Sequence, residues 1–82
     1  MGNSSGVMPS ASGFLITPDD NNDLPVPIRG IYIGSSGNLK VLLQDDTNAV
    51  TFVGLIVGIL LSIQVKRVYS TGTTAGSLIG LS

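Results

Sequence analysis

The chain has 82 residues, of which four are basic and five are acidic, and its formal net charge is −1. Cysteine and histidine are both absent, which excludes disulfides and the common Cys/His metal sites. Charged side chains make up only 11% of the sequence, so a basic surface that binds nucleic acid is not expected. A domain of this length has a marginal core, and contact with other protein is the expected reinforcement.

The first segment, residues 1–13, reads MGNSSGVMPSASG and is dominated by small and polar residues. After Met1, its only large apolar side chains are Val7 and Met8. So little apolar surface cannot offset the entropy that is lost on ordering. The sequence therefore predicts a flexible N-terminal arm over 1–13 and a single β domain over 14–82.

A short apolar patch and an acidic loop follow. Residues 14–18, FLITP, are typical of an extended segment, and residues 19–27, DDNNDLPVP, contain two prolines that exclude a helix. Oxygen donors at Asp19, Asn21 and Asp23 alternate as in a calcium loop, but the glycine and glutamate of that pattern are missing. We expect a solvated loop built on Asx turns.

Beyond this loop, short apolar runs alternate with turn sequences. The runs cover 28–34, 39–44 and 49–53, and a last short strand is expected around 77–81. Strand-forming residues separated by glycine, serine, asparagine and aspartate indicate an antiparallel meander. We therefore predict an all-β fold, a small antiparallel sandwich or barrel of five or six strands.

Residues 49–65 are uncharged, and Lys66 and Arg67 follow directly. A membrane-spanning helix needs about 20 apolar residues, and roughly 17 is the lower limit. Apolar and polar residues alternate over 61–66, which is the period of a half-buried strand rather than a helix. The strand interpretation is preferred. The alternative is a small single-span membrane protein with residues 49–65 in the bilayer.

Two glycines, Gly54 and Gly58, stand four residues apart in this stretch. A GxxxG spacing occurs in membrane helix dimers, but it is common by chance in glycine-rich chains. We expect the two glycines to bracket a turn at 55–57. That turn joins strands over 49–53 and 59–70 as a hairpin.

No set of side chains suggests catalysis. Histidine and cysteine are absent as base or nucleophile, and the acids lie in turns rather than in an apolar pocket. We expect neither enzymatic activity nor a cofactor. Around Gly72, the threonines Thr71, Thr73 and Thr74 are expected to form a hydrogen-bonded turn rather than a recognition surface.

Two arginines need acidic partners. Arg29 could pair with Asp20 or Asp23 within the chain, or equally with a carboxylate of another protein. Arg67 is expected on the face of its strand that carries the apolar side chains, where burial requires a counter-charge. One of the acids at 45–46 is the expected partner.

Two stretches, LPVPIRGIYIGSSGNLKVLLQDDTNAVTF and VKRVYSTGTTAGSLIGL, resemble a family of small virion proteins of tailed bacteriophages and gene transfer agents. The resemblance covers most of residues 20–82. The matching residues are Asp20, Leu24, Pro25, Arg29, Gly30, Tyr32, Gly34, Gly37, Val41, Asp46, Val50, Phe52, Arg67, Val68, Gly72, Thr73, Thr74, Ala75 and Leu81.

The resemblance implies a virion structural protein on the outer surface of the capsid, as a head decoration or cement protein or as the base of a head spike or fibre. It implies a homo-oligomer, a trimer or a pentamer, that contacts the major capsid protein and in some arrangements a spike or fibre protein. Neither nucleic acid nor a membrane is an expected partner. The connection VGLIVGILLS departs from the polar connection of the family, and burial against protein would explain its apolar character.

The expected contacts combine the arm, the first apolar patch, the two arginines and the apolar connection. The candidate interface residues are Val7, Met8, Phe14, Leu15, Ile16, Arg29, Leu55, Ile56, Val57, Ile59 and Arg67. A carbohydrate-binding module is the remaining alternative, but its aromatic side chains would have to cluster, and in the sequence they do not.

Overall fold

The computed structural model describes residues 12–82, so the predicted contacts at Val7 and Met8 lie outside the described residues. Seven strands and no helix occur in this part of the chain. The strands are β1 (Gly13–Leu15), β2 (Gly30–Tyr32), β3 (Gly37–Leu43), β4 (Val50–Leu55), β5 (Leu60–Leu61), β6 (Val65–Val68) and β7 (Ile79–Leu81). The last two residues of the predicted arm belong to the fold, because Ser12 bonds to Ser82 and Gly13 begins β1.

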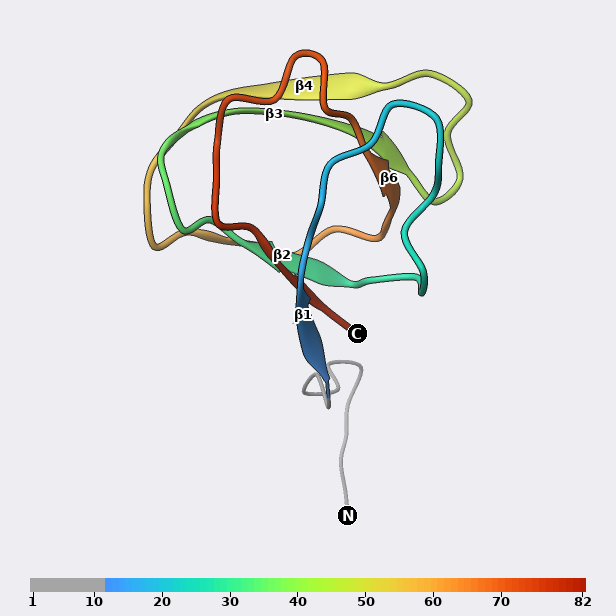
Figure 1. Ribbon diagram of the computed structural model, residues 1–82, viewed down its shortest axis with the longest axis horizontal. Coiled ribbons are helices and arrows are strands. Elements are labelled where there is room, and N and C mark those ends of the chain that lie inside the picture. Colours follow the sequence, from blue (N-terminus) through green and yellow to red (C-terminus); the bar gives the residue numbers. More distant parts are fainter. Residues whose placement is uncertain (1–11) are drawn as a thin grey trace.

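Two antiparallel sheets make up the fold. The first, sheet A, has the order β1-β7-β2-β5, and the second, sheet B, has the order β4-β3-β6. In Figure 1, β3 and β4 lie at the top of the view and β1 and β2 at the bottom. The predicted all-β class is confirmed, as a small sandwich of seven strands rather than five or six.

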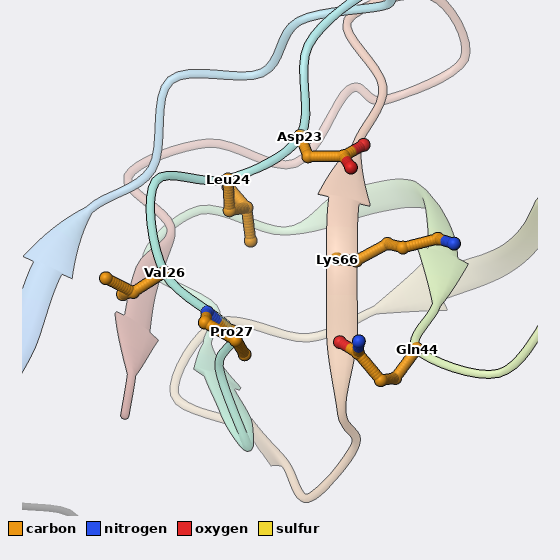
Figure 2. Close-up of a pocket in the computed structure, with 6 residues that line it drawn as sticks. All are labelled: Asp23, Leu24, Val26, Pro27, Gln44 and Lys66. Carbon is orange, nitrogen blue, oxygen red and sulfur yellow. The ribbon is translucent and has the colours of Figure 1, made fainter.

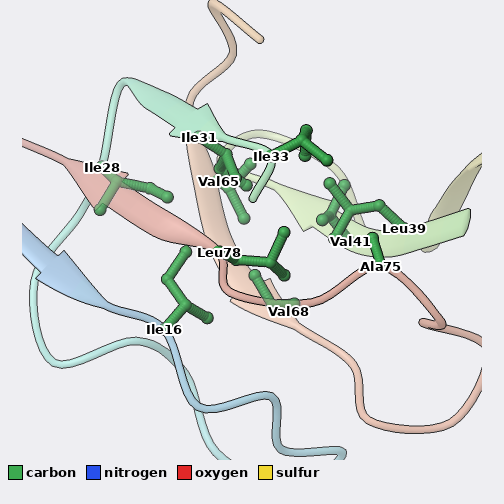
Figure 3. Packing of buried hydrophobic residues seen from close by; sticks show 10 residues of the cluster. All are labelled: Ile16, Ile28, Ile31, Ile33, Leu39, Val41, Val65, Val68, Ala75 and Leu78. Carbon is green, nitrogen blue, oxygen red and sulfur yellow. The ribbon is translucent and has the colours of Figure 1, made fainter. Parts of the chain in front are cut away.

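Side chains of both sheets meet in one apolar core (Figure 3). In β3, alternation turns Leu39 and Val41 inward, and both are fully buried. The other buried members of the cluster are Ile16, Ile28, Ile31, Ile33, Val65, Val68, Ala75 and Leu78. Aliphatic side chains dominate, as the strand-forming runs of the sequence require. Burial of this surface is the main stabilising contribution to the fold.

The uncharged stretch 49–65 is not a helix. It contains β4 and β5, which corrects the alternative interpretation of a span in a bilayer. Among residues 12–82 the structure has no apolar helix long enough to cross a membrane.

The hairpin that we expected within this stretch is also wrong. β4 pairs with β3 in sheet B, whereas β5 pairs with β2 in sheet A. The turn between them carries the chain from one sheet to the other, with φ of 90° at Gly58. This turn is attached to sheet A, because the Gly58 N–H donates to the Ile33 carbonyl at 2.8 Å and the Ile33 N–H donates to the Ile59 carbonyl at 2.9 Å.

The predicted strand over 59–70 is divided for a related reason. Its first part, β5, stays in sheet A, and its second part, β6, returns to sheet B. In β6 the register shifts, so that Leu43 pairs with Val65 and Leu42 pairs with Arg67. The extra residue is Lys66. This bulge turns Arg67 away from the buried face, which corrects the expected position of its side chain.

The two connections that cross between the sheets at one end of the sandwich lie against each other. One joins β2 to β3 and the other joins β6 to β7. A Cβ at Gly34 would overlap the Ser77 carbonyl, and a Cβ at Gly37 would lie 2.6 Å from the Ala75 nitrogen. Only glycine allows the two backbones to approach this closely.

Two threonine hydroxyls complete the hydrogen bonds of β3 where β6 has ended. The Lys40 N–H donates to Thr73 Oγ1 at 3.0 Å, and the Asn38 N–H donates to Thr74 Oγ1 at 2.8 Å. Gly72, with φ of 97°, turns the chain just before them. The predicted hydrogen-bonded turn around this glycine is confirmed, and its partner is a neighbouring strand.

The acidic loop is fixed to the end of β6 by its aspartates. Asp19 accepts the Asn21 N–H at 2.8 Å, which confirms the expected Asx turn. Asp20 accepts the Thr71 N–H at 2.8 Å. Arg67 bonds to Asp23, with its Nη2 2.8 Å from the carboxylate, so its partner is not one of the acids at 45–46.

We predict that Gly34→Ala lowers the free energy of unfolding by about 1–3 kcal/mol, the usual cost of overpacking. The added methyl group meets the backbone of Ser77, which cannot rotate away. Gly76→Ala is the matched control, because its Cβ would lie 3.5 Å from the Ser35 Cβ, an ordinary contact. Urea denaturation of the three proteins measures the effect. Equal midpoints for the two variants would contradict the proposed close contact.

We also predict that acid weakens the attachment of the loop. The Thr71 hydroxyl and then the Thr71 N–H bond to Asp20 and hold the pKa of its carboxyl below the ordinary 3.8. A bond from the Asn22 side chain does the same for the pKa of Asp19. A lowered pKa in the folded state contributes stability that is complete above the unfolded value and is lost as the pH falls through the folded value.

Urea midpoints measured between neutral pH and about pH 2, a range that spans these carboxyl pKa values, test this prediction. The midpoint of the unmodified chain should fall below pH 3.8, and it should fall less steeply in Asp20→Asn. Asp45→Asn, at an exposed turn position, is the control. Parallel pH profiles for all three proteins would show that Asp20 has no such role.

Candidate interaction surface

The outer face of sheet A carries a continuous row of apolar side chains. The strand register aligns Leu15 with Ile79, Ile79 with Tyr32, and Tyr32 with Leu60. The row therefore crosses all four strands of the sheet. Leu15 is 66% exposed, Leu60 54% and Tyr32 42%. We call these four residues the apolar row.

Glycines flatten the surface beside this row. A Cβ at Gly30 would lie 3.6 Å from Leu60 and 3.8 Å from Leu81, so both leucine side chains lie over a strand position that has none of its own. A Cβ at Gly13 would lie 3.3 Å from the Leu81 side chain, so Leu81 also lies over this glycine. No strand residue of this face carries a charge. The result is a low, uncharged surface of the kind that protein interfaces use.

The outer face of sheet B is different. Lys40 and Arg67 both lie near Tyr69, with their charged groups 5.2 Å and 5.8 Å from the centre of its ring. The bond to Asp23 raises the pKa of Arg67, so this charge is permanent. Of the two outer faces, that of sheet A carries no charged strand residue, whereas that of sheet B carries Lys40 and Arg67.

A second exposed apolar region follows the uncharged stretch. Eight large apolar side chains are exposed in the described part of the chain, and five of them belong to residues 50–60. Val53 on β4 is the most exposed, at 76%, followed in this stretch by Ile56 at 63%. The apolar connection is therefore only partly covered by the chain itself, because Leu55 and Ile59 pack against the core whereas Ile56 and Val57 are exposed.

The structure brings only some of the predicted interface residues to the surface. Leu15, Arg29, Ile56 and Val57 are exposed; Phe14, Leu55 and Ile59 are half-buried against the core; Arg67 is half-buried; and Ile16 is buried. Within residues 12–82 the structure has one ion pair, Arg67–Asp23, so Arg29 is not paired with Asp20 or Asp23. Contact of these residues with another protein stays a prediction.

Sequence reasoning missed Tyr32, Leu60 and Ile79. Each belongs to a short run in which neighbouring side chains are all apolar, so the run does not reveal which residue points outward. Strand pairing decides this, because it joins strands that are far apart in the chain. The alternation of Tyr32 with Ile31 and Ile33 was the one available signal.

Two surface hollows offer little room for a ligand. The first, of about 160 Å³, is lined by Asp23, Leu24, Val26, Pro27, Gln44 and Lys66. Figure 2 shows that the loop 23–27 runs alongside β6 at this point. The second, of about 230 Å³, lies between the turn 43–46 and residues 63–64. Both are smaller than typical ligand pockets of roughly 300–1,000 Å³.

Metal binding finds no ready site in the described residues, since 12–82 contain no group of three or more potential metal ligands. The aspartates of the acidic loop are already engaged by Asn21, Thr71 and Arg67. The described surface does offer exposed apolar contact area, in the apolar row and over residues 50–60.

Comparison with known proteins agrees with this description. No protein-family model matches the chain, and no curated protein matches it. A chain in the solved structure "Capsid of native GTA particle computed with C5 symmetry" is similar, where GTA denotes a gene transfer agent. The two share 30% sequence identity with a TM-score of 0.81, over 90% of this chain and 84% of that chain.

The two chains are alike in sequence and in fold over most of their lengths. This similarity confirms that the chain is related to capsid proteins of phage-like particles, as the sequence resemblance implied. The chain therefore belongs to one family with a protein of a gene transfer agent capsid, and it is a phage-like virion structural protein.

Proposed function

We propose that this protein is an accessory subunit bound to the outer surface of a phage-like capsid, as a decoration or cement protein or as the base of a spike or fibre. The observation that carries the proposal is the similarity to a chain of a gene transfer agent capsid structure. The role is adhesion, with no enzymatic step and no cofactor. The major capsid protein is the main partner, and a spike or fibre protein is a further one.

The apolar row supplies the contact with the capsid. Four large side chains in line across sheet A can be covered together by one flat surface. Removal of apolar surface from water contributes about 25 cal/mol per Å², so a face of this kind gives moderate affinity. Repeated contacts in an oligomer then add to firm attachment, because later contacts form within an already bound assembly.

The opposite orientation of the domain is less favourable. Contact through sheet B would desolvate Lys40 and Arg67, and a buried charge without a full set of partners is costly. The polar face is therefore proposed to point away from the capsid. Arg29, which is exposed and close to Leu81 through its backbone, is proposed to reach a carboxylate at the margin of the contact.

A binding experiment with purified heads that lack this subunit tests the proposal. Leu60→Glu places a charge in the apolar row, and we expect it to weaken attachment about tenfold or more, equivalent to about 1.4 kcal/mol. Gln64→Glu adds the same charge at an exposed position outside the row and should bind as the unmodified chain does. Occupancy is read by quantitative gel analysis of pelleted heads.

Two results of this experiment contradict the proposal in different ways. Failure of the unmodified chain to bind the heads would remove the capsid role itself. Equal binding of Leu60→Glu and Gln64→Glu would keep that role and exclude the outer face of sheet A as the contact.

Copy number per particle tests the proposed oligomer. Pentamers at the twelve vertices of an icosahedral shell give about 60 copies, and trimers distributed over the shell give several hundred. We expect one of these values from a quantified gel of intact particles. A value of only a few copies per particle would exclude both arrangements and would indicate a component of a unique vertex.

A further inference from the structure

The turn at residues 56–59 is an exposed apolar projection at one end of the molecule. Ile56 is 63% exposed and Val57 is 56% exposed. Apart from its neighbours in the chain, a Cβ at Gly54 or at Gly58 would meet no atom within 4 Å. The space around the turn is therefore open. We call Ile56 and Val57 the apolar tip.

Hydrogen bonds hold the apolar tip in place. The Ile59 N–H donates to the Ile56 carbonyl at 3.3 Å and closes the turn, with Gly58 at a φ of 90°. The Gly58 N–H in turn donates to the Ile33 carbonyl at 2.8 Å. A group that is already ordered loses little conformational entropy when a partner covers it. The tip is therefore suited to enter a complementary hollow.

This end of the molecule has no charged side chains. Residues 30–39 and 50–61, which run to this end and back, contain neither basic nor acidic residues. In Figure 1 the turn lies at the left end of the longest axis, and the loop 23–27 lies at the right end. Cover by another protein would bury no charge here, so the large cost of desolvating a charged group does not arise.

The opposite end has a hollow of matching size and polarity. It is the hollow of about 160 Å³ beside the loop 23–27, and its apolar lining consists of Leu24, Val26 and Pro27. Val26 is 43% exposed and lies outside the apolar row. A cavity of roughly 150 Å³ accepts a group of the size of benzene. This loop hollow, too small for most ligands, therefore has room for an aliphatic side chain.

The charged groups at the rim of the loop hollow do not have to be buried when it is filled. Asp23 already bonds to Arg67. In Figure 2 the Lys66 side chain extends away from the loop 23–27. A lysine can cover apolar surface with its aliphatic part and keep its ammonium group in water.

We propose that the apolar tip of one copy of this chain fills the loop hollow of the next copy, so that copies join head to tail in a ring. The proposal rests on the oligomer named under the proposed function. A ring of three or five copies uses two different surfaces of each chain, which must fit each other. The tip and the hollow are such a pair, and every copy carries both. The occupant of the hollow is therefore a second copy.

The proposed contact is compatible with attachment through sheet A. In Figure 1 sheet A lies at the bottom of the view, and the tip and the loop hollow lie at the two sides. A flat surface that covers the apolar row from below leaves both ends of the domain for neighbouring copies. Contacts between copies then run along the capsid surface rather than away from it.

Cysteine cross-linking tests the contact, because the chain has no cysteine of its own. Val26→Cys places a thiol at the hollow, and Val57→Cys places one at the tip. On mild oxidation, we expect the double variant to give a ladder of disulfide-linked copies that ends at three or five. Each single variant should remain unlinked, because like positions do not meet in a head-to-tail contact. Non-reducing gels measure the products.

A matched pair of cysteines controls for random collision. Thr17 is exposed and lies outside both the tip and the hollow. The variant Thr17→Cys/Val57→Cys should cross-link about tenfold less than Val26→Cys/Val57→Cys, because only thiols held together by the contact have a high effective concentration.

A charge in the tip gives a second reading. Ile56→Asp, added to Val26→Cys/Val57→Cys, should lower the yield of linked copies about tenfold or more, since it would place a carboxylate against an apolar lining. Thr17→Asp in the same double variant should leave the yield unchanged. Circular dichroism checks that each protein is folded, and Ile56→Ser replaces Ile56→Asp if the latter is not.

Three results overturn the proposal, whether the oxidation is carried out in solution or on occupied heads. They are equal yields from Val26→Cys/Val57→Cys and its Thr17 control, self-linking of either single variant, and a ladder without an upper limit. Leu60→Glu in the double-cysteine variant should still give the ladder in solution while it weakens head binding. A ladder from a chain that does not bind heads would remove the capsid role and keep the ring.

Discussion

The sandwich depends on one close backbone contact between its two crossing connections. Gly34 and Gly37 allow the segment that leads to β7 to lie directly on the segment that leads to β3. Ser77 adopts φ of 50° at this point, a conformation that is uncommon outside glycine. Because both connections pass between the sheets, their contact fixes the spacing at which the two inner faces pack.

The spacing in turn explains why so small a chain has a complete core. The strands of sheet A have only two or three residues each, yet Ile31, Ile33, Leu39 and Val41 are fully buried. The threonines after Gly72 bond to β3 and the aspartates of the acidic loop bond near the end of β6. Motif residues that are scattered in the sequence therefore serve the same purpose, which is to hold the ends of the two sheets together.

Much of the fold could be predicted from local pattern, because strand-forming runs and turn residues are local properties. The pairing of strands could not. An apolar turn with glycines looks the same in sequence whether the chain returns to the same sheet or crosses to the other, and the crossing at Gly58 was therefore missed. The partner of Arg67 was missed because a bulge at Lys66 reverses the faces that simple alternation assigns. The apolar row required the register of four strands that are distant in the chain.

The contrast between the two outer faces has a consequence for the particle. In the proposed arrangement, a domain that rests on its sheet A side covers the shell beneath it and turns Lys40, Arg67 and Tyr69 toward the medium. Each attached copy then places on the particle exterior an aromatic ring flanked by Lys40 and by the Arg67–Asp23 ion pair. Because each copy carries a formal net charge of −1, the electrophoretic mobility of the whole particle would change with the number of sites that are filled.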